Sequence, residues 1–86
     1  LQQRGDTDDA IAEYERAIQI RPGDSFARES LGLLFQTKGN IKEAIEEYSE
    51  AARARPDVPL LRLNLGIAYK IDGQIDAAIE QLRHVV

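Results

Sequence analysis

The sequence predicts an all-α protein, a solenoid of stacked helix pairs, and two observations lead to this fold class. The first is an internal repeat of 34 residues: 17 of the 52 residue pairs compared at that shift are identical, whereas unrelated sequences of this composition would share about three or four. The second is that apolar residues within each repeat return at helical spacing. Helix pairs that recur with this period stack on their neighbours, which makes one continuous core in an 86-residue chain.

One expected helix of each repeat presents a face of small and apolar residues. Its apolar positions follow the spacing i, i+1, i+4, i+7 and i+8, which is one face of an α-helix. In three successive repeats these positions hold Ala10, Ile11, Tyr14, Ala17 and Ile18, then Ala44, Ile45, Tyr48, Ala51 and Ala52, then Ala78, Ile79, Leu82, Val85 and Val86. The other expected helix of each repeat covers residues 25–38 and 59–72, and residues 1–4 are expected to be a remnant of an earlier one.

Turn residues separate the predicted helices. Those that end a helix stand at matching positions of the repeat: Pro22, Pro56, Gly39 and Gly73. Proline disfavours the helical conformation in the residue before it, and glycine adopts the left-handed conformation that ends a helix. Pro59 suits the first turn of a helix. Asp6 and Asn40 have the spacing of N-caps with an acidic residue three positions later, and Gln74 is expected to be a weaker cap.

The signature residues of the two longer repeats are Arg28, Leu31, Gly32, Phe35, Ala44, Tyr48 and Pro56, and then Arg62, Leu65, Gly66, Tyr69, Ala78 and Leu82. Their spacing and type resemble the tetratricopeptide repeat (TPR) family, whose pattern is W-x₂-L-G-x₂-Y, then A-x₃-F, then P. The resemblance implies a right-handed α-solenoid of antiparallel helix pairs, with about two and a half repeats in one segment spanning residues 1–86. Residues 1–24 would form a partial repeat, 25–58 a full repeat, and 59–86 a nearly full repeat that lacks its end.

Two expectations about helix packing accompany this resemblance. Arg28 and Arg62 stand where the family often has a large aromatic residue, and we expect their stems to lie along apolar surface with the charges in water. Gly32 is expected to lie opposite Ala44 in the helix pair, and the same arrangement recurs one repeat later. A side chain at this glycine would keep the two backbones apart.

Composition excludes several classes of function. The chain has no cysteine and one histidine, so disulfides, thiolate ligands and a histidine metal cluster are excluded. Adjacent carboxylates such as Glu46 and Glu47 diverge on a helix, and no glycine motif for binding phosphate occurs. We therefore expect no enzyme, no cofactor and no metal. The acidic residues between Lys42 and Arg53 are expected to form an outer face, with these two cations as partial partners.

Net charge limits the partners. The value of −4 disfavours nucleic acid and anionic membrane, and it counts against a nucleic-acid solenoid of the pentatricopeptide type, whose repeat is one residue longer. No apolar run approaches the roughly 18 residues that a membrane span requires. We therefore expect a soluble stretch of unknown localisation, without a targeting or transmembrane segment. Because the chain starts at Leu1, we expect it to be an internal part of a longer protein.

The helices expected over residues 25–38 and 59–72 are the first helices of their repeats. Besides the apolar face that packs on the second helix of the repeat, each of them carries another apolar stripe that helix pairing does not need. It runs at i, i+4, i+7 and i+11 on a separate face, and in the TPR family this stripe lines the concave surface where partner peptides lie. We predict that a protein or peptide partner binds a groove formed by Phe26, Glu29, Ser30, Leu33, Leu60, Leu63, Asn64, Ile67, Lys70 and Ile71. The amide of Asn64 would hydrogen-bond an extended partner backbone. Specificity at the rim would come from Glu29, Gln36 and Lys70.

A second interpretation is a scaffold segment that assembles with copies of itself. Solenoid ends need a polar cap, and we expect both ends to be apolar, the front through Ile11, Tyr14, Ala17 and Ile18, and the back through Ala78, Leu82 and Val85. Head-to-tail contact would continue the solenoid, whereas contact between like ends would close a dimer.

Overall fold

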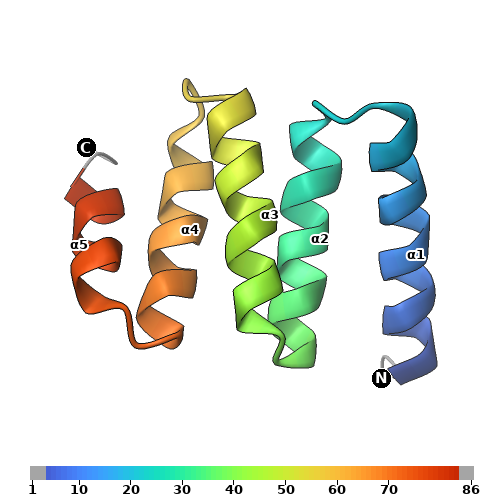
Figure 1. Ribbon diagram of the computed structural model, residues 1–86, viewed down its shortest axis with the longest axis horizontal. Coiled ribbons are helices and arrows are strands. Elements are labelled where there is room, and N and C mark those ends of the chain that lie inside the picture. Colours follow the sequence, from blue (N-terminus) through green and yellow to red (C-terminus); the bar gives the residue numbers. More distant parts are fainter. Residues whose placement is uncertain (1–3, 84–86) are drawn as a thin grey trace.

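In the computed structural model, five α-helices lie side by side (Figure 1). They are α1 (Arg4–Ile20), α2 (Ser25–Lys38), α3 (Ile41–Ala54), α4 (Pro59–Ile71) and α5 (Ile75–Arg83). The structure describes residues 4–83, and no strand occurs within that range. The predicted all-α class is therefore confirmed, and the helices expected over residues 25–38 and 59–72 correspond to α2 and α4.

Each helix packs on the helices that precede and follow it along the chain. Short turns connect them, so consecutive helices run antiparallel, from α1 at one side of the molecule to α5 at the other (Figure 1). The molecule measures 35 × 26 × 19 Å. This is the solenoid of antiparallel helix pairs that a 34-residue helical repeat predicts.

The core is centred on α3, which has a packed helix on either side. Ala44 and Tyr48 on its buried face pack with Leu65 and Ala68 of α4. A second buried cluster, nearer the other end of the same two helices, consists of Ala51, Ala52 and Leu61. The small alanine side chains of α3 let the neighbouring backbones approach closely, which gives the dense packing typical of protein interiors.

The same kind of turn ends α2 and α4. Gly39 (φ 90°) and Gly73 (φ 83°) both adopt the left-handed conformation, as predicted. At each turn, the glycine amide and the next amide donate to carbonyls of the preceding helical turn at 2.8 to 3.0 Å. These bonds satisfy carbonyl groups that the end of a helix would otherwise leave unpaired. Pro59 is the first residue of α4, also as predicted.

The beginning of α1 differs from the prediction. The sequence predicts a remnant helix over residues 1–4 and an N-cap at Asp6, but α1 begins at Arg4 and includes both Gly5 and Asp6. Residues 1–3 lie outside the described part of the chain. The turns at Gly39 and Gly73 each join two packed helices, whereas no packed helix precedes α1 among the described residues. Glycine permits a left-handed turn but does not require one.

The helix caps also differ in part. Asn40 precedes α3 as predicted, but its side chain makes no capping hydrogen bond. Gln74 precedes α5, and its side-chain amide donates to Asp72 at 2.7 Å. A side-chain cap forms at α2, where Oδ1 of Asp24 accepts a hydrogen bond from the amide of Ala27 at 3.1 Å. Sequence analysis missed this cap, although aspartate directly before a helix is a recognised signal.

The helical glycines lie against larger side chains than predicted. A Cβ atom on Gly32 would lie 2.6 Å from Cε1 of Tyr48, and one on Gly66 would lie 2.8 Å from Cδ2 of Leu82. The atoms nearest to Gly32 are therefore those of Tyr48, while Gly66 also approaches the carbonyl of Ala78, the residue predicted to lie opposite it. The glycine makes room for a whole side chain at the equivalent place in both helix pairs.

Candidate functional site

The predicted groove residues fall on the exposed sides of α2 and α4. Five of its large apolar side chains keep between 40% and 67% of their surface exposed, and these are Phe26, Leu33, Leu60, Ile67 and Ile71. Lys70 is also exposed, whereas Glu29, Ser30, Leu63 and Asn64 are half-buried. Single exposed apolar residues are common on protein surfaces, but these five recur at helical spacing on α2 and α4.

A hydrogen bond joins the two sides of this groove. Nδ2 of Asn64 on α4 donates to Oε2 of Glu29 on α2 at 2.9 Å. We predicted the Asn64 amide as a donor and acceptor for a partner backbone, and one of its donors is thus already engaged. A primary amide has two N–H donors and a carbonyl oxygen, so its second donor and its oxygen can still serve a partner.

Glu29 also acts on the core beneath the groove. Burial, with a smaller contribution from the negative charge of Glu29, raises the pKa of Tyr48 to about 12. The Tyr48 hydroxyl donates to Oε1 of Gln36 at 3.1 Å. The oxygen of Gln36, a residue that we placed at the rim, is therefore occupied by this buried tyrosine.

The α1 side of the groove contains a small cavity that sequence analysis did not anticipate. Its volume is about 270 Å³, and it is lined by Ala10, Tyr14, Ser30, Leu33 and Leu34. The Tyr14 ring also meets the Phe26 ring edge to face, with centroids 6.4 Å apart and an interplanar angle of 69°. Residues of α1 thus contribute to this surface, because α1, the last helix of one repeat, packs beside α2, the first helix of the next.

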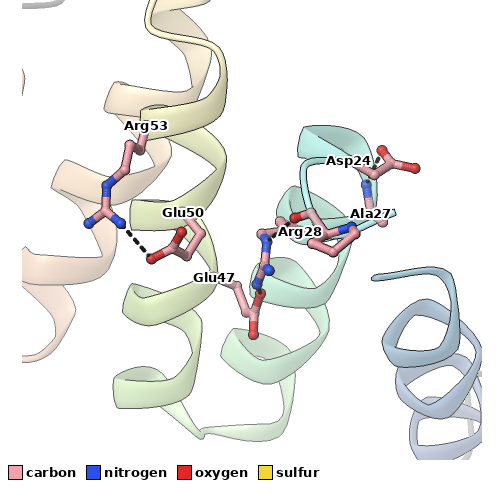
Figure 2. A network of polar contacts seen from close by, with 7 residues as sticks. Asp24, Ala27, Arg28, Glu47, Glu50 and Arg53 are labelled. Atoms are coloured by element: carbon pink, nitrogen blue, oxygen red, sulfur yellow. Dashed lines mark hydrogen bonds and ion pairs between the residues drawn. The ribbon is translucent and has the colours of Figure 1, made fainter. Parts of the chain in front are cut away.

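On the outer side of the helix pair, Arg28 makes a bridge that corrects our expectation of a solvated charge. Its Nη1 atom lies 3.0 Å from Oε1 of Glu47 on α3, and both side chains are only 20% exposed. Its Nε donates to the carbonyl of Pro22 at 3.1 Å. Figure 2 shows Arg28 reaching from α2 to α3. One repeat later Arg62 donates to Gln81 at 3.4 Å. Both arginines therefore contact the residue 19 positions later, and the recurrence of arginine at this position of the repeat was the sequence signal for the bridge.

The acidic face of α3 is partly paired. Glu50 forms an ion pair with Arg53 at 2.9 Å, as predicted (Figure 2). Lys42, however, pairs with Asp72 on the turn after α4, at 3.1 Å, and not with the glutamates of its own helix. The hydrogen bond from Gln74, and to a smaller extent the contact with Lys42, lowers the pKa of Asp72 below its usual value.

The two ends of the solenoid differ, which corrects the expectation that both are apolar. At the front, Ile11 is buried, and Tyr14, Ala17 and Ile18 are half-buried against the rest of the fold. At the back, Ala78 is buried as well, and Val85 lies outside the described residues. The exposed apolar residues of α5 are Ile75, Ile79 and Leu82.

Within residues 4–83, no helix is long and apolar enough to cross a membrane. The same residues contain no group of three or more histidine, cysteine or acidic side chains that could hold a metal ion.

Stacked antiparallel helix pairs define an α-solenoid. The sequence model of the TPR repeat matches residues 1–39 and 32–73, and the chain therefore belongs to the TPR family. TPR repeats are generally non-catalytic protein–protein interaction modules, and their partners are typically proteins. The chain is an interaction module of this class.

Solved structures agree with this assignment. The chain is similar to a protein described as "Crystal structure of MamA", with 26% identity and a TM-score of 0.87 over 92% of this chain and 46% of that one. A second structure, "Crystal structure of MamA protein", gives 26% identity and a TM-score of 0.88 over 93% and 44%. A third, "MamA MSR-1 C2", shares the fold at 20% identity and a TM-score of 0.85. The chain spans less than half the length of these neighbours, and no curated protein sequence matches it.

Proposed function

We propose that the inner face of α2 and α4 is a groove that binds a peptide or a helix of a partner protein. The observation that carries this proposal is the exposure of Phe26, Leu33, Leu60, Ile67 and Ile71. These side chains lie outside the buried clusters that hold the helices together. The exposed part of these side chains is not used by the core, and a partner that covered it would gain from its burial.

The gain is large enough to support specific binding. Complete burial of a large aliphatic or aromatic side chain contributes about 1.5 to 3 kcal/mol relative to complete exposure. Because these residues are already about half-buried, covering the remainder contributes on the order of 1 kcal/mol each. Leu63 is half-buried beside them and adds less. The polar pair of Asn64 and Glu29 lies among them and would fix the position of the partner.

A substitution that separates binding from folding tests the groove. Ile67→Glu places a charge on the exposed stripe, and we expect it to abolish capture of a partner from a lysate while the circular dichroism spectrum stays that of a helical protein. Ile20→Glu is the matched control, since Ile20 is 75% exposed at the end of α1 and lies outside the groove. If Ile67→Glu captured the same partner as the unmodified chain, or if it lost its helicity, the groove would be rejected.

Self-association is a second candidate, and the exposed face of α5 favours it. Ile75, Ile79 and Leu82 are exposed there, whereas the outer side of α1 is mostly polar, with exposed residues such as Asp9, Glu13 and Arg16. Contact between two α5 faces would close as a dimer, and head-to-tail growth would lack an apolar partner surface. Light scattering over a concentration series tests this. Ile79→Glu should restore a monomer, and a chain that is strictly monomeric without this change rules the candidate out.

A further inference from the structure

We propose that the partner of this groove is an extended segment carrying a lysine or arginine about three residues from a large apolar side chain, with Glu29 as the counter-ion of the basic residue. This inference rests on the proposed function, because it specifies what the groove on α2 and α4 selects. It is carried by three features: a carboxylate without a cation on the α4 flank of α2, an apolar cavity on its α1 flank, and the distance between the two.

The first feature is the position and charge of Glu29. It lies on the same face of α2 as Phe26, three residues before it, and Leu33, four residues after it, so it stands within the apolar stripe. It is half-buried, and its carboxylate accepts a hydrogen bond from Asn64 at 2.9 Å. That bond orients the carboxylate without neutralising it, since an amide carries no net charge.

No cation of the described residues takes up this charge. Arg28, the adjacent residue, pairs with Glu47 on the outer side at 3.0 Å, and Lys42 and Lys38 pair with Asp72 and Asp8. The negative charge of Glu29 acts on buried Tyr48, whose pKa is raised mainly by burial and to a smaller extent by this charge. A half-buried carboxylate in this position is stabilised by a cation that arrives with a partner.

The second feature is the cavity between α1 and α2. At about 270 Å³, it is below the roughly 300 to 1,000 Å³ of sites that enclose whole small molecules. It is open to the inner face and lined mainly by apolar groups of Tyr14, Leu33 and Leu34. It therefore suits one large apolar side chain of a partner as an anchor.

The third feature is the distance between anchor and charge. The cavity lies on the α1 side of α2, and the pair of Glu29 and Asn64 lies on its α4 side. Gaps on the two flanks of one helix lie about as far apart as neighbouring helix axes, roughly 8 to 10 Å, and an extended chain advances about 3.3 Å per residue. A segment that crosses α2 thus places its anchor and its basic residue about three positions apart, and the net charge of −4 favours the same basic partner.

Selection from random linear peptides displayed on phage tests the proposal without a known ligand. Three targets are compared: the unmodified chain, Glu29→Gln, and Glu46→Gln as the matched control, since Glu46 is exposed on the outer side of α3. The unmodified chain and Glu46→Gln should enrich peptides with lysine or arginine about three positions from leucine, phenylalanine, tyrosine or tryptophan. Glu29→Gln keeps the shape and an acceptor for Asn64 but should lose the enrichment of basic residues.

Titration of one selected peptide then measures the contribution of the charge. We expect Glu29→Gln to weaken its binding about threefold to fivefold, Glu46→Gln to leave it unchanged, and Ile67→Glu to abolish it. Selected peptides that lack a basic residue, or a basic preference that persists in Glu29→Gln, would overturn this inference and leave the groove intact. If no peptide were enriched, or if the selected peptides still bound Ile67→Glu, the groove itself would be rejected and this inference with it.

Discussion

Helices α3 and α5 occupy the same position in successive repeats, yet their surroundings differ. Tyr48 of α3 is 1% exposed, and Ile41 and Ile45 pack against the cluster that α3 shares with α4. The residues 34 positions later, Ile75, Ile79 and Leu82, are exposed on α5. The two helices carry nearly the same pattern, so the pattern specifies which face is apolar, while the presence of a following helix decides whether that face is buried.

The largest expected difference between the two helices concerns one equivalent residue. Tyr48→Ala should lower the free energy of unfolding by about 3 to 5 kcal/mol, because it leaves a cavity in the core. Leu82→Ala, at a position 37% exposed, should cost about 1 kcal/mol. Urea unfolding followed by circular dichroism measures both. Equal losses would mean that the face of α5 is covered as well as that of α3.

A second contrast between the two helices is the response to alkaline pH, because α3 carries a buried tyrosine and α5 does not. Burial, and less so the charge of Glu29, raises the pKa of Tyr48 to about 12, whereas an unfolded tyrosine has a pKa of about 10. The stability that comes from neutral Tyr48 is therefore complete below pH 10 and is lost as the pH rises toward 12. The loss should reach about 2 to 3 kcal/mol.

Urea unfolding between pH 9 and pH 12 measures this loss, and Tyr48→Phe is the control because it removes the ionisable hydroxyl. The variant should lose less stability than the unmodified chain over this range. A decline of the same size in Tyr48→Phe would assign the effect to other groups.

The two helical glycines offer a third contrast, of intermediate size. Alanine at Gly32 would press its Cβ atom on the ring of buried Tyr48, at 2.6 Å, and should cost about 2 kcal/mol. Alanine at Gly66 would meet Cδ2 of Leu82 at 2.8 Å and its Cγ at 2.9 Å, but Leu82 is 37% exposed and can shift more readily than Tyr48. At this position, alanine stabilises a helix by up to about 1 kcal/mol relative to glycine, and this gain should nearly cancel the free-energy cost of the contact. Thermal unfolding of both variants checks the difference, and a larger loss at Gly66 would refute it.

The smallest expected effect concerns the bridge between the helices of each pair. Glu47→Gln should remove the charge partner of Arg28 and cost about 0.5 to 1 kcal/mol, whereas Gln81→Glu should supply one to Arg62 and add about 0.5 kcal/mol. Glu47→Gln gives the first helix pair the arginine–glutamine contact of the second, and Gln81→Glu gives the second pair the arginine–glutamate contact of the first. Both changes should shrink in high salt, which screens such pairs. Changes that do not depend on salt would show that packing, not charge, is responsible.

The candidate site could be predicted in outline but not in its contacts. The spacing of Phe26, Leu33 and Ile67 placed them on a face that helix pairing leaves free, and they are exposed. The bond between Asn64 and Glu29 joins side chains on different helices and depends on how far apart the repeats stack. The cavity beside Tyr14 likewise requires the spacing between α1 and α2. No rule that reads neighbours along the chain supplies these distances.

Sequence alone determined the repeat, the helices, the left-handed turns at Gly39 and Gly73 and the apolar face of each helix. These features depend on interactions within a few residues, which a 34-residue repeat shows more than once. Tertiary structure decided that Gly5 belongs to a helix, that Arg28 pairs with Glu47, and that Ile11 at the front of the solenoid is buried. Burial and side-chain pairing depend on which helix lies alongside. Equivalent residues therefore have different surroundings at different places in the solenoid.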